Sequence, residues 1–408
     1  MSIENSFYQQ VEACRSCGAR KLTAAVSLGE QYIIDFPEPG GLEQQAPLIL
    51  VKCGSCHLVQ LEHTVNQDRL FGRFWYQSSI SPSMSRDLKD VVDKAILALP
   101  ELKRGEAVVD IGSNDGTLLR HYPSSLTRIG FEPASNVAAK AGRSIMTINS
   151  YFNAENYLRL GYLKAKIITA IAMFYDLPDP NSFVADVVRI MDNKGVFVIQ
   201  QNYLPYMLER NGFDNIVHEH LEYYCLTSLE PLLNRHGLRI FRMTVNEVNG
   251  GSFRVYACFK NQYPEEPQLS IFRKAEIKQG LDKDTPYLRF AEEIRNVRKR
   301  LRNLIGILKD RGKTVFVLGA GTRGNTILQY CGLDYTLIDG AVDRNPEKWG
   351  RITAGGHIPI MSRDKAGKPD YFLVLPYHFL DEFEAQERDY LANGGRFILP
   401  LPEPRILP

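Results

Sequence analysis

Two glycine-rich loops, each at the end of an apolar run, constrain the fold of this chain more than any other sequence feature. The first is DIGSNDG at 110–116, which overlaps the run AVVDI, and the second is GAGTRG at 319–324, which continues the run VFVL. A buried strand that turns through glycines into a helix typically begins a doubly wound α/β unit. The chain is therefore predicted to contain two such units.

Around both loops, apolar runs alternate with stretches of helical pattern. The predicted strands are 107–111, 127–132, 166–174 and 195–201 around the first loop, and 313–320, 334–340, 371–376 and 395–400 around the second. Apolar strands separated by helices indicate a parallel sheet that is covered by helices on both faces. A helix predicted from Tyr287 to Lys309 would connect the two units, because its apolar residues recur on one face.

Four of the seven cysteines form two C-x-x-C pairs, Cys14 with Cys17 and Cys53 with Cys56. Each pair can give two thiolates to one ion, and four thiolates complete the tetrahedral shell that zinc prefers. Such a shell leaves no position for a substrate, so the predicted Zn²⁺ site is structural. Redox motifs, a coincidental pairing and a nucleic-acid-binding zinc ribbon are the alternatives.

The chain length of 408 residues exceeds what one hydrophobic core usually serves. We predict three parts: a zinc-binding module at 1–80, an α/β domain at 81–262 and a second, Rossmann-like α/β domain at 263–408. The predicted fold class is therefore α/β, with a small N-terminal module.

Composition limits the classes of partner. Lys and Arg total 49 against 47 Asp and Glu, and this balance argues against nucleic acid, whose phosphates need a basic surface. No apolar run is long enough to cross a membrane, and the first residues lack a secretory pattern. Paired cysteines outside a disulfide scaffold indicate a reducing compartment. We expect a cytoplasmic monomer or homodimer that acts on a small molecule.

The first glycine loop predicts a cofactor site. Its D-x-G-x-x-x-G form differs from the dinucleotide G-x-G-x-x-G and resembles motif I of class I S-adenosylmethionine (SAM) methyltransferases. Glu132 ends the next predicted strand, where a carboxylate can accept hydrogen bonds from both ribose hydroxyls. Adenine contacts are expected at Asn153, and the methionine moiety at Ala172 and Met173. The predicted cofactor-binding residues are Asp110, Gly112, Ser113, Asn114, Gly116, Glu132, Asn153, Ala172 and Met173.

The second glycine loop has the formal G-x-G-x-x-G spacing, and Asp339 follows at the end of the next predicted strand. Three interpretations stay open for it. It could bind NAD(P), it could hold a phosphate of the substrate at the helix N-terminus, or it could be a structural turn.

A reactive segment is predicted at His218, Glu219 and His220, just after the strand that closes the cofactor cleft. In an extended chain both imidazoles would lie on one side and Glu219 on the other. Histidine suits proton transfer near neutral pH because of its unperturbed pKa. The alternatives are a metal site, for which no third ligand stands out, and histidines buried in the core.

Taken together, the chain resembles the sugar C-methyltransferases of deoxysugar pathways, of the type that 3-C-methylates a nucleotide-linked 4-keto sugar. The resemblance covers essentially the whole chain. Its motifs are the paired C-x-x-C module, Y-x-S-S from Tyr76, DIGSNDG, HEH at 218–220, GGSFRVY at 250–256 and the stretch from GAGTRGNTIL onward.

The resemblance implies that the middle domain binds SAM and that the C-terminal domain closes over the nucleotide sugar. It implies that His220 removes the proton from the carbon beside the ketone, with Glu219 and Tyr76 assisting and His218 nearby. The predicted substrate-binding residues are Ser78, Ser79, Asn202, Asn249, Ser252, Arg254, Gly321, Arg323, Asp343 and Arg344.

Three departures from the family pattern lie near the reacting group. Val217 stands where many members have Tyr, MFYDLPDP replaces a polar stretch, and Gln200 to Tyr203 replace a segment with an acid and a proline. They leave the acceptor atom open, so O- or N-methylation is an alternative. A nicotinamide-dependent oxidoreductase and a zinc-ribbon binding protein are alternatives from other classes.

Overall fold

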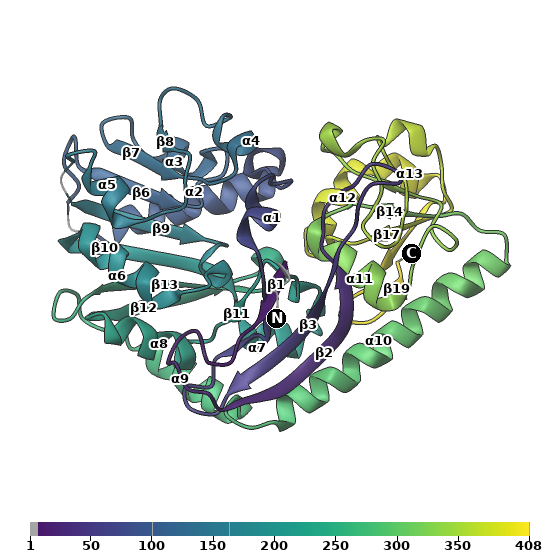
Figure 1. Ribbon diagram of the computed structural model, residues 1–408. Coiled ribbons are helices and arrows are strands. Elements are labelled where there is room, and N and C mark those ends of the chain that lie inside the picture. Colours follow the sequence, from purple (N-terminus) through teal and green to yellow (C-terminus); the bar gives the residue numbers. More distant parts are fainter. Residues whose placement is uncertain (1–6, 100, 163, 408) are drawn as a thin grey trace, which may run out of the picture.

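The chain folds into two α/β lobes with an antiparallel sheet and one long helix running between them (Figure 1). The computed structural model describes residues 7–99, 101–162 and 164–407. Both lobes carry mostly parallel strands, so the predicted α/β class is confirmed. None of the helices in the described part of the chain is both long and apolar enough to cross a membrane.

The N-terminal sheet is completed by a strand from the middle of the chain. It has the order β11-β4-β3-β2, with antiparallel pairing throughout. Its strands are β2 (Leu22–Tyr32), β3 (Gln45–Cys53), β4 (Val59–Leu61) and β11 (Glu222–Tyr223). A separate pair is formed by β1 (Tyr8–Gln10) and β5 (His63–Val65). Because β11 follows the HEH segment directly, the N-terminal sheet is built onto the predicted reactive segment.

The middle lobe has a seven-stranded sheet with the order β12-β13-β10-β9-β6-β7-β8. Its parallel strands are β6 (Ala107–Ile111), β7 (Thr127–Phe131), β8 (Met146–Ile148), β9 (Ala165–Ile171) and β10 (Met191–Asn202). The antiparallel strands β12 (Leu238–Asn246) and β13 (Ser252–Phe259) extend the edge beyond β10. The strand order reverses at β6 and β9, and ligands of such sheets bind outside the carboxyl ends at that switch point.

The C-terminal lobe has a six-stranded sheet with the order β16-β15-β14-β17-β18-β19. Its strands are β14 (Val315–Leu318), β15 (Gly340–Val342), β16 (Ile360–Met361), β17 (Tyr371–Val374), β18 (Arg396–Leu399) and the antiparallel β19 (Arg405–Ile406). The strand predicted over 334–340 is wrong, because residues 334–339 form a turn and β15 begins only at Gly340. Asp343, and not Asp339, therefore follows the carboxyl end of this strand.

Helices cover the sheets and link them. The α-helices of the N-terminal and middle parts are α1 (Gln67–Phe71), α2 (Pro82–Leu97), α3 (Thr117–His121), α4 (Ser135–Ala138), α5 (Ala154–Leu158), α6 (Pro180–Ile190), α7 (Leu204–Glu209), α8 (Leu226–Arg235) and α9 (Gln268–Gln279). Those of the C-terminal part are α10 (Thr285–Asp310), α11 (Thr322–Cys331), α12 (Leu380–Gln386) and α13 (Arg388–Ala392). Short 3₁₀ helices are η1 (Ser78–Ile80), η2 (Phe174–Asp176), η3 (Phe213–Asn215), η4 (Val248–Gly250), η5 (Pro346–Lys348), η6 (Asp364–Ala366) and η7 (Tyr377–Phe379).

Helix α10 confirms the helix predicted between the two units. It runs from the middle lobe to the C-terminal lobe beneath β2 and α11 (Figure 1). Its buried residues recur every three or four positions: Tyr287, Phe290, Ile294, Val297, Leu301, Ile305 and Leu308. One apolar face along the whole helix lets it pack against both lobes.

Candidate functional site

The four paired cysteines lie in one cluster. Their sulfur atoms all lie within 4.8 Å of one another, with 3.5 Å between Cys14 Sγ and Cys56 Sγ and 3.5 Å between Cys17 Sγ and Cys53 Sγ. Four convergent thiolates fit a tetrahedral Zn²⁺ ion and leave no open coordination position. The clustering predicted from the two C-x-x-C pairs is confirmed, and the donor set fits a structural metal.

Arg15 anchors the zinc-binding segment to the N-terminal sheet through its side chain and to the middle lobe through its carbonyl. Its guanidinium is buried and donates to Leu61 O at 2.6 Å and Thr64 Oγ1 at 2.7 Å. The same guanidinium lies 3.8 Å from Glu222 on β11. Asn181 on α6 donates from Nδ2 to the carbonyl of Arg15 at 3.0 Å. The cysteine cluster thereby positions the strand that follows the HEH segment.

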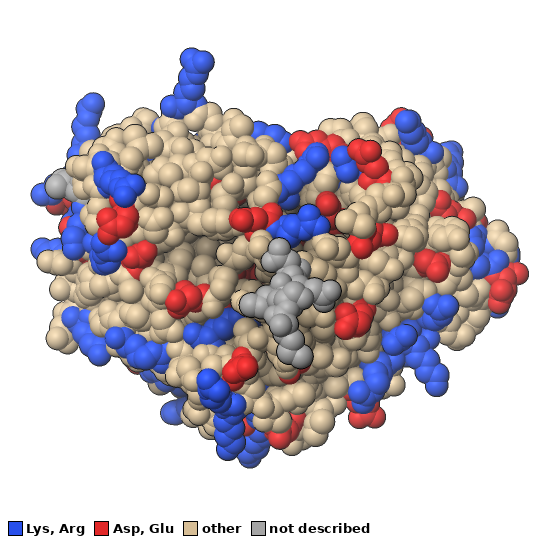
Figure 2. All heavy atoms as spheres, in the orientation of Figure 1, with Lys and Arg blue, Asp and Glu red and all other residues tan. Residues whose placement is uncertain are grey.

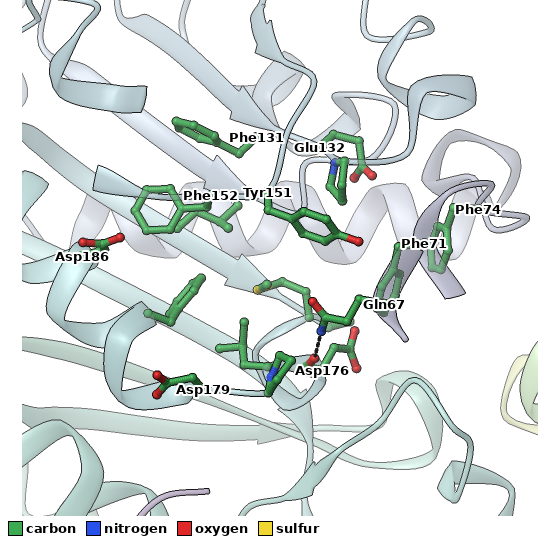
Figure 3. A pocket seen from close by; sticks show the side chains of 18 of the residues that line it. Gln67, Phe71, Phe74, Phe131, Glu132, Tyr151, Phe152, Asp176, Asp179 and Asp186 are labelled. Atoms are coloured by element: carbon green, nitrogen blue, oxygen red, sulfur yellow. Dashed lines mark hydrogen bonds between the residues drawn. The ribbon is translucent and has the colours of Figure 1, made fainter. Parts of the chain in front are cut away.

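A first cavity of about 350 Å³ lies at the carboxyl ends of β6, β7 and β9, with α1 across from them (Figure 3). Gly112, at φ 71°, lines it at the turn after β6. An added Cβ there would lie 3.0 Å from Met173 Cγ, so this position needs glycine. Ala172 and Met173, after β9, line the cavity beside this turn. The cavity occupies the switch point of the sheet.

Glu132 lines this cavity at the end of β7. Its Oε2 accepts a hydrogen bond from the Asn114 N–H at 2.9 Å, and its Oε1 accepts one from Ala134 N–H at 2.8 Å. Burial raises the pKa of Glu132. Asp110 lies deeper, where its Oδ1 accepts from Thr169 Oγ1 at 2.6 Å and burial raises its pKa to about 7. Glu132 thus faces the cavity, whereas Asp110 supports the loop from behind.

The segment with Tyr76, Ser78 and Ser79 is docked on the glycine loop. Asn114 Oδ1 accepts from the Ser78 N–H at 3.0 Å, and Asn114 Nδ2 donates to Tyr76 O at 3.0 Å. Asp115 Oδ2 accepts from the Ser79 N–H at 3.0 Å. The two serines therefore meet the loop through their backbones.

Besides Asp110, three predicted cofactor residues have structural contacts and do not line the cavity. Ser113 is buried beneath Gly130, and Gly116, at φ 76°, begins α3 against Ile145. Asn153 caps α5, since its Oδ1 accepts from the Asn156 N–H at 2.8 Å. Tyr151 and Phe152, just before Asn153, line the cavity instead.

The first cavity is acidic. The carboxyl groups that line it belong to Glu132, Asp176, Asp179 and Asp186. No Lys or Arg is among the described residues that line it. Such a lining favours a cationic ligand over a phosphate.

A second cavity of about 490 Å³ lies at the carboxyl ends of β14, β15 and β17, next to the segment 75–81. The glycines of the second loop have different surroundings. An added Cβ at Gly319 would lie 2.5 Å from Pro376 Cγ, and one at Gly324 would lie 2.7 Å from Leu375 Cβ. An added Cβ at Gly321 would have no atom within 4 Å. Helix α11 begins directly after Gly321 without a side-chain cap. Its first N–H groups can therefore receive an anion.

Most predicted substrate residues of the C-terminal lobe line this second cavity. Arg323 pairs with Asp214, with 2.6 Å between Nη2 and Oδ2, and donates from Nη1 to Asn249 O at 2.8 Å. Asp343 Oδ2 lies 3.1 Å from Lys348 Nζ. The cavity is lined by Tyr76, Asn249, Gly321, Arg323, Asp343, Arg344, Lys348 and Arg363, among others. Figure 2 shows basic and acidic side chains interspersed on this face of the molecule. The cavity likewise mixes both charges, since Glu382 and Glu387 line it beside Arg344 and Arg363.

Ser252 and Arg254 line neither of the two large cavities, although both are predicted substrate residues. Ser252 Oγ donates to Val248 O at 2.9 Å. The buried Arg254 guanidinium donates to Gln200 Oε1 at 2.7 Å and Asp90 Oδ2 at 2.8 Å, beneath α2. Alternate residues of β13 share one face, and here that face is turned toward α2.

The HEH segment is a turn and not an extended strand, so the side-by-side arrangement of its imidazoles in an extended chain does not apply. The His220 N–H donates to Val217 O at 3.1 Å, and the two imidazoles consequently diverge. His218 Nε2 lies 3.0 Å from Ala46 O in the N-terminal sheet, and burial lowers the pKa of His218 to about 4. Glu219 lies between them, and burial raises its pKa to about 7.

His220 lines neither of the two large cavities. Its Nδ1 lies 2.8 Å from Asn215 O, which favours a proton on Nδ1 and leaves the Nε2 lone pair free. Burial and then the charge of Arg323 lower the pKa of His220 to about 3. The ring packs on Tyr175 with 4.1 Å between centroids. Asn202 and His220 line a small third cavity between β10 and the HEH turn.

Three residues near the cavities were not predicted as site residues. Tyr175 covers His220, and Asp176 lines the first cavity. His378 lines the second cavity just after β17. The sequence could have marked each of them as a site residue, since all three follow the carboxyl end of a predicted strand.

Family models match the chain in three consecutive regions. A model described as "Putative zinc binding domain" matches residues 14–71, "Methyltransferase domain" matches 83–242 and "C-methyltransferase C-terminal domain" matches 247–402. The glycine loop, the acidic end of β7 and the acidic cavity thus lie in the methyltransferase region. The protein is a SAM-dependent methyltransferase with a zinc-binding N-terminal region.

A curated relative gives the finer assignment. The C-methyltransferase NovU of Streptomyces niveus is 33% identical over 97% of this chain and 97% of its own length. The chain therefore belongs to the C-methyltransferase family. This assignment replaces the O- and N-methyltransferase, oxidoreductase and binding-protein alternatives.

Solved structures match part of the chain. One is the plantazolicin methyltransferase BpumL in complex with a desmethylPZN analog and S-adenosylhomocysteine (SAH), which is 11% identical. The match covers 44% of this chain and 86% of the BpumL chain, with a TM-score of 0.36. Another is the magnesium protoporphyrin IX methyltransferase of Synechocystis PCC 6803 with bound SAM, which is 11% identical. This match covers 47% of this chain and 88% of the Synechocystis chain, with a TM-score of 0.32.

Proposed function

We propose that this C-methyltransferase transfers a methyl group from SAM, held in the first cavity, to a carbon of a nucleotide-linked 4-keto deoxysugar held in the second. The observation that carries the proposal is the contrast in charge between the two cavities. The first is lined by four carboxyl groups and by no Lys or Arg of the described chain. The second is lined by Arg323, Arg344, Lys348 and Arg363, three of which pair with the lining carboxylates Asp343, Glu382 and Glu387, and by a free helix N-terminus.

The first cavity suits the cofactor. SAM carries positive charge on its sulfonium and ammonium groups, and it supplies an activated methyl group when bound. Glu132, at the end of β7, would accept hydrogen bonds from the ribose hydroxyls. Gly112 would allow close approach of the backbone, and Phe152 would flank the adenine.

The second cavity suits a nucleotide-linked acceptor. Phosphate groups bind at helix N-termini, where unpaired N–H groups and the helix dipole favour negative charge. Gly321 leaves space above the start of α11. Asp343 follows β15, where a ribose would lie. Tyr76 and Asn249 line the part of the cavity that would hold the sugar, next to Arg323.

His220 would act as the base. Its Nε2 would take the proton from the carbon beside the ketone, and the electron pair of that C–H bond would become an enolate. This carbon then bonds to the methyl carbon, while the electron pair of the broken C–S bond stays on sulfur. The charge of Arg323, which lowers the pKa of His220, would stabilise the enolate oxygen together with the Tyr76 hydroxyl.

Hydrogen exchange tests the enolate directly. The acceptor is incubated in D₂O with the enzyme and SAH, and deuterium at the carbon beside the ketone is followed by NMR. The wild type should incorporate deuterium, and His220→Asn should lose the exchange while its SAM affinity stays the same. His218→Asn is the matched control and should retain exchange, because His218 faces Ala46. Absence of exchange in the wild type, with methylation intact, would exclude the enolate.

A further inference from the structure

Three of the four carboxyl groups that line the first cavity already have partners within the protein. Glu132 accepts from two backbone N–H groups. Asp179 accepts from the Asn181 and Ser182 N–H groups at 3.1 and 3.0 Å. Asp186 accepts from the Ala154 N–H at 3.0 Å and from Arg189 at 3.1 Å. Their charges are therefore engaged before any ligand enters.

Asp176 differs from these three. Its Oδ1 is buried and has no hydrogen-bond partner among the described residues. Its backbone is engaged, since its N–H donates to Met173 O at 3.0 Å and its carbonyl accepts from Gln67 Nε2 at 3.0 Å (Figure 3). Burial, with Glu219 and Glu222 close by, raises the pKa of Asp176 well above its ordinary range. No Lys or Arg of the described residues pairs with this carboxyl group, and an incoming positive charge would favour its ionised form.

The position of Asp176 relates it to the reacting end of the cofactor. It ends η2, three residues after Met173, whose side chain packs over Gly112. It therefore lies on the side of the cavity at the ends of β6 and β9, whereas Glu132 and Phe152 lie on the side of β7 and β8. With the ribose on Glu132, the sulfur end of the cofactor extends toward Asp176.

We propose that Asp176 is the specificity-determining residue by which this site distinguishes SAM from its product SAH, through a contact between its carboxylate and the sulfonium. SAM and SAH differ by one methyl group and one positive charge. A carboxylate beside the sulfur attracts the sulfonium and has no such attraction for the neutral thioether. Methyl transfer thus removes the interaction and favours exchange of SAH for new SAM. The inference concerns the cofactor alone and holds for any acceptor.

The test compares Asp176→Asn with the wild type by calorimetric titration with SAM and with SAH, without acceptor. Asparagine keeps the shape of the side chain and removes its charge. SAM should bind about tenfold more weakly to the variant, whereas SAH affinity should change little, so the preference for SAM collapses. Equal weakening of both ligands, or no change in either, would overturn the proposal.

Asp179→Asn is the matched control. It removes a charge from the same cavity, yet an asparagine oxygen can still accept the N–H groups at the start of α6. The ratio of SAM to SAH affinity should stay at the wild-type value in this variant. A collapse of the ratio here too would assign the effect to the overall charge of the cavity and overturn a specific role for Asp176. Asp176→Ser provides a second uncharged variant, with the same expected ratio, should the asparagine variant not fold.

Discussion

At the residue scale, Asn114 joins the two cavities. Its backbone N–H donates to Glu132 in the first cavity, and its side chain holds the backbones of Tyr76 and Ser78 beside the second. Its φ of 50° lies in the left-handed region, which asparagine tolerates better than most residues. The loop proposed to hold SAM therefore also fixes the segment proposed to meet the acceptor.

Removal of the Glu132 carboxylate tests the cofactor assignment. Glu132→Ala should weaken SAM binding by about 2–3 kcal/mol, because charge-assisted hydrogen bonds to the ribose are lost and the Asn114 N–H loses its acceptor. Calorimetric titration with SAM measures the change, and the melting temperature without ligand reports any loss of stability. Unchanged SAM affinity would remove Glu132 from the site.

His218 should make stability depend on pH. The unfolded chain binds the imidazole proton below its ordinary pKa of 6.5, whereas the folded protein binds it only near pH 4, so stability falls as the pH drops across this window. The loss approaches about 3 kcal/mol, which is the free energy of a shift from 6.5 to about 4. Denaturant unfolding at pH 7 and pH 5 should show a smaller difference for His218→Gln. An equal difference in both proteins would contradict this role.

At the element scale, β11 connects the zinc-binding region to the reactive turn. It pairs with β4 in the N-terminal sheet, and it begins two residues after His220. Arg15, between two of the cysteines, lies against Glu222 on β11. The zinc-binding region therefore supports the turn that presents His220.

Loss of a zinc ligand should consequently affect both stability and catalysis. Cys14→Ser should lower the zinc content below one ion per chain, lower the melting temperature and reduce methylation, because β11 loses its support. Metal analysis and thermal unfolding measure the first two effects. Cys331→Ser, at a buried cysteine outside the cluster, is the control and should keep its zinc. One full equivalent of zinc in Cys14→Ser would contradict the ligand assignment.

Local sequence signals predicted the elements that depend on local physics. The glycine loops, the cysteine cluster and helix α10 were predicted because turn residues, ligand spacing and one-faced periodicity each act within a short segment. The start of β15 at Gly340 was missed, because the apolar residues of 334–340 form a packed turn. Parallel pairing with β14, which is a long-range contact, selects the strand.

The conformation of the reactive segment could not be predicted from local sequence. HEH was identified as a candidate, but its turn depends on contacts with distant residues such as Ala46, which fixes His218 in the N-terminal sheet. Asn153 and Arg254 have the right residue types for binding, yet Asn153 caps α5 and the guanidinium of Arg254 donates to Asp90 on α2. The cap at Asn153 is a local pattern, whereas Asp90 lies 164 residues from Arg254 and no local pattern reports it.

At the scale of the whole molecule, the second cavity is formed where the N-terminal segment meets the C-terminal lobe. Arg323 reaches from the start of α11 to Asp214 and Asn249 of the middle lobe. Trp75 O accepts from Asn345 Nδ2 at 3.2 Å, which links the Tyr76 segment to the C-terminal lobe. The acceptor site is thus shared between parts that are distant in the sequence.

Filling the space above α11 should separate the two cavities functionally. Gly321→Val introduces a branched side chain where a phosphate is proposed to lie, and it should raise the KM for the acceptor at least about tenfold with no change in SAM affinity. Titration with a nucleoside diphosphate should show the same loss. Gly306→Val, on α10 with open space around it, is the control. Normal nucleotide binding by Gly321→Val would argue against this site.

The most direct test of the account is a crystal structure of the protein with SAH and a nucleoside diphosphate. We expect SAH in the acidic cavity with its ribose on Glu132, and the diphosphate at the start of α11 beside Gly321. The opposite arrangement, or either ligand bound outside these two cavities, would contradict the division of the molecule into a cofactor site and an acceptor site.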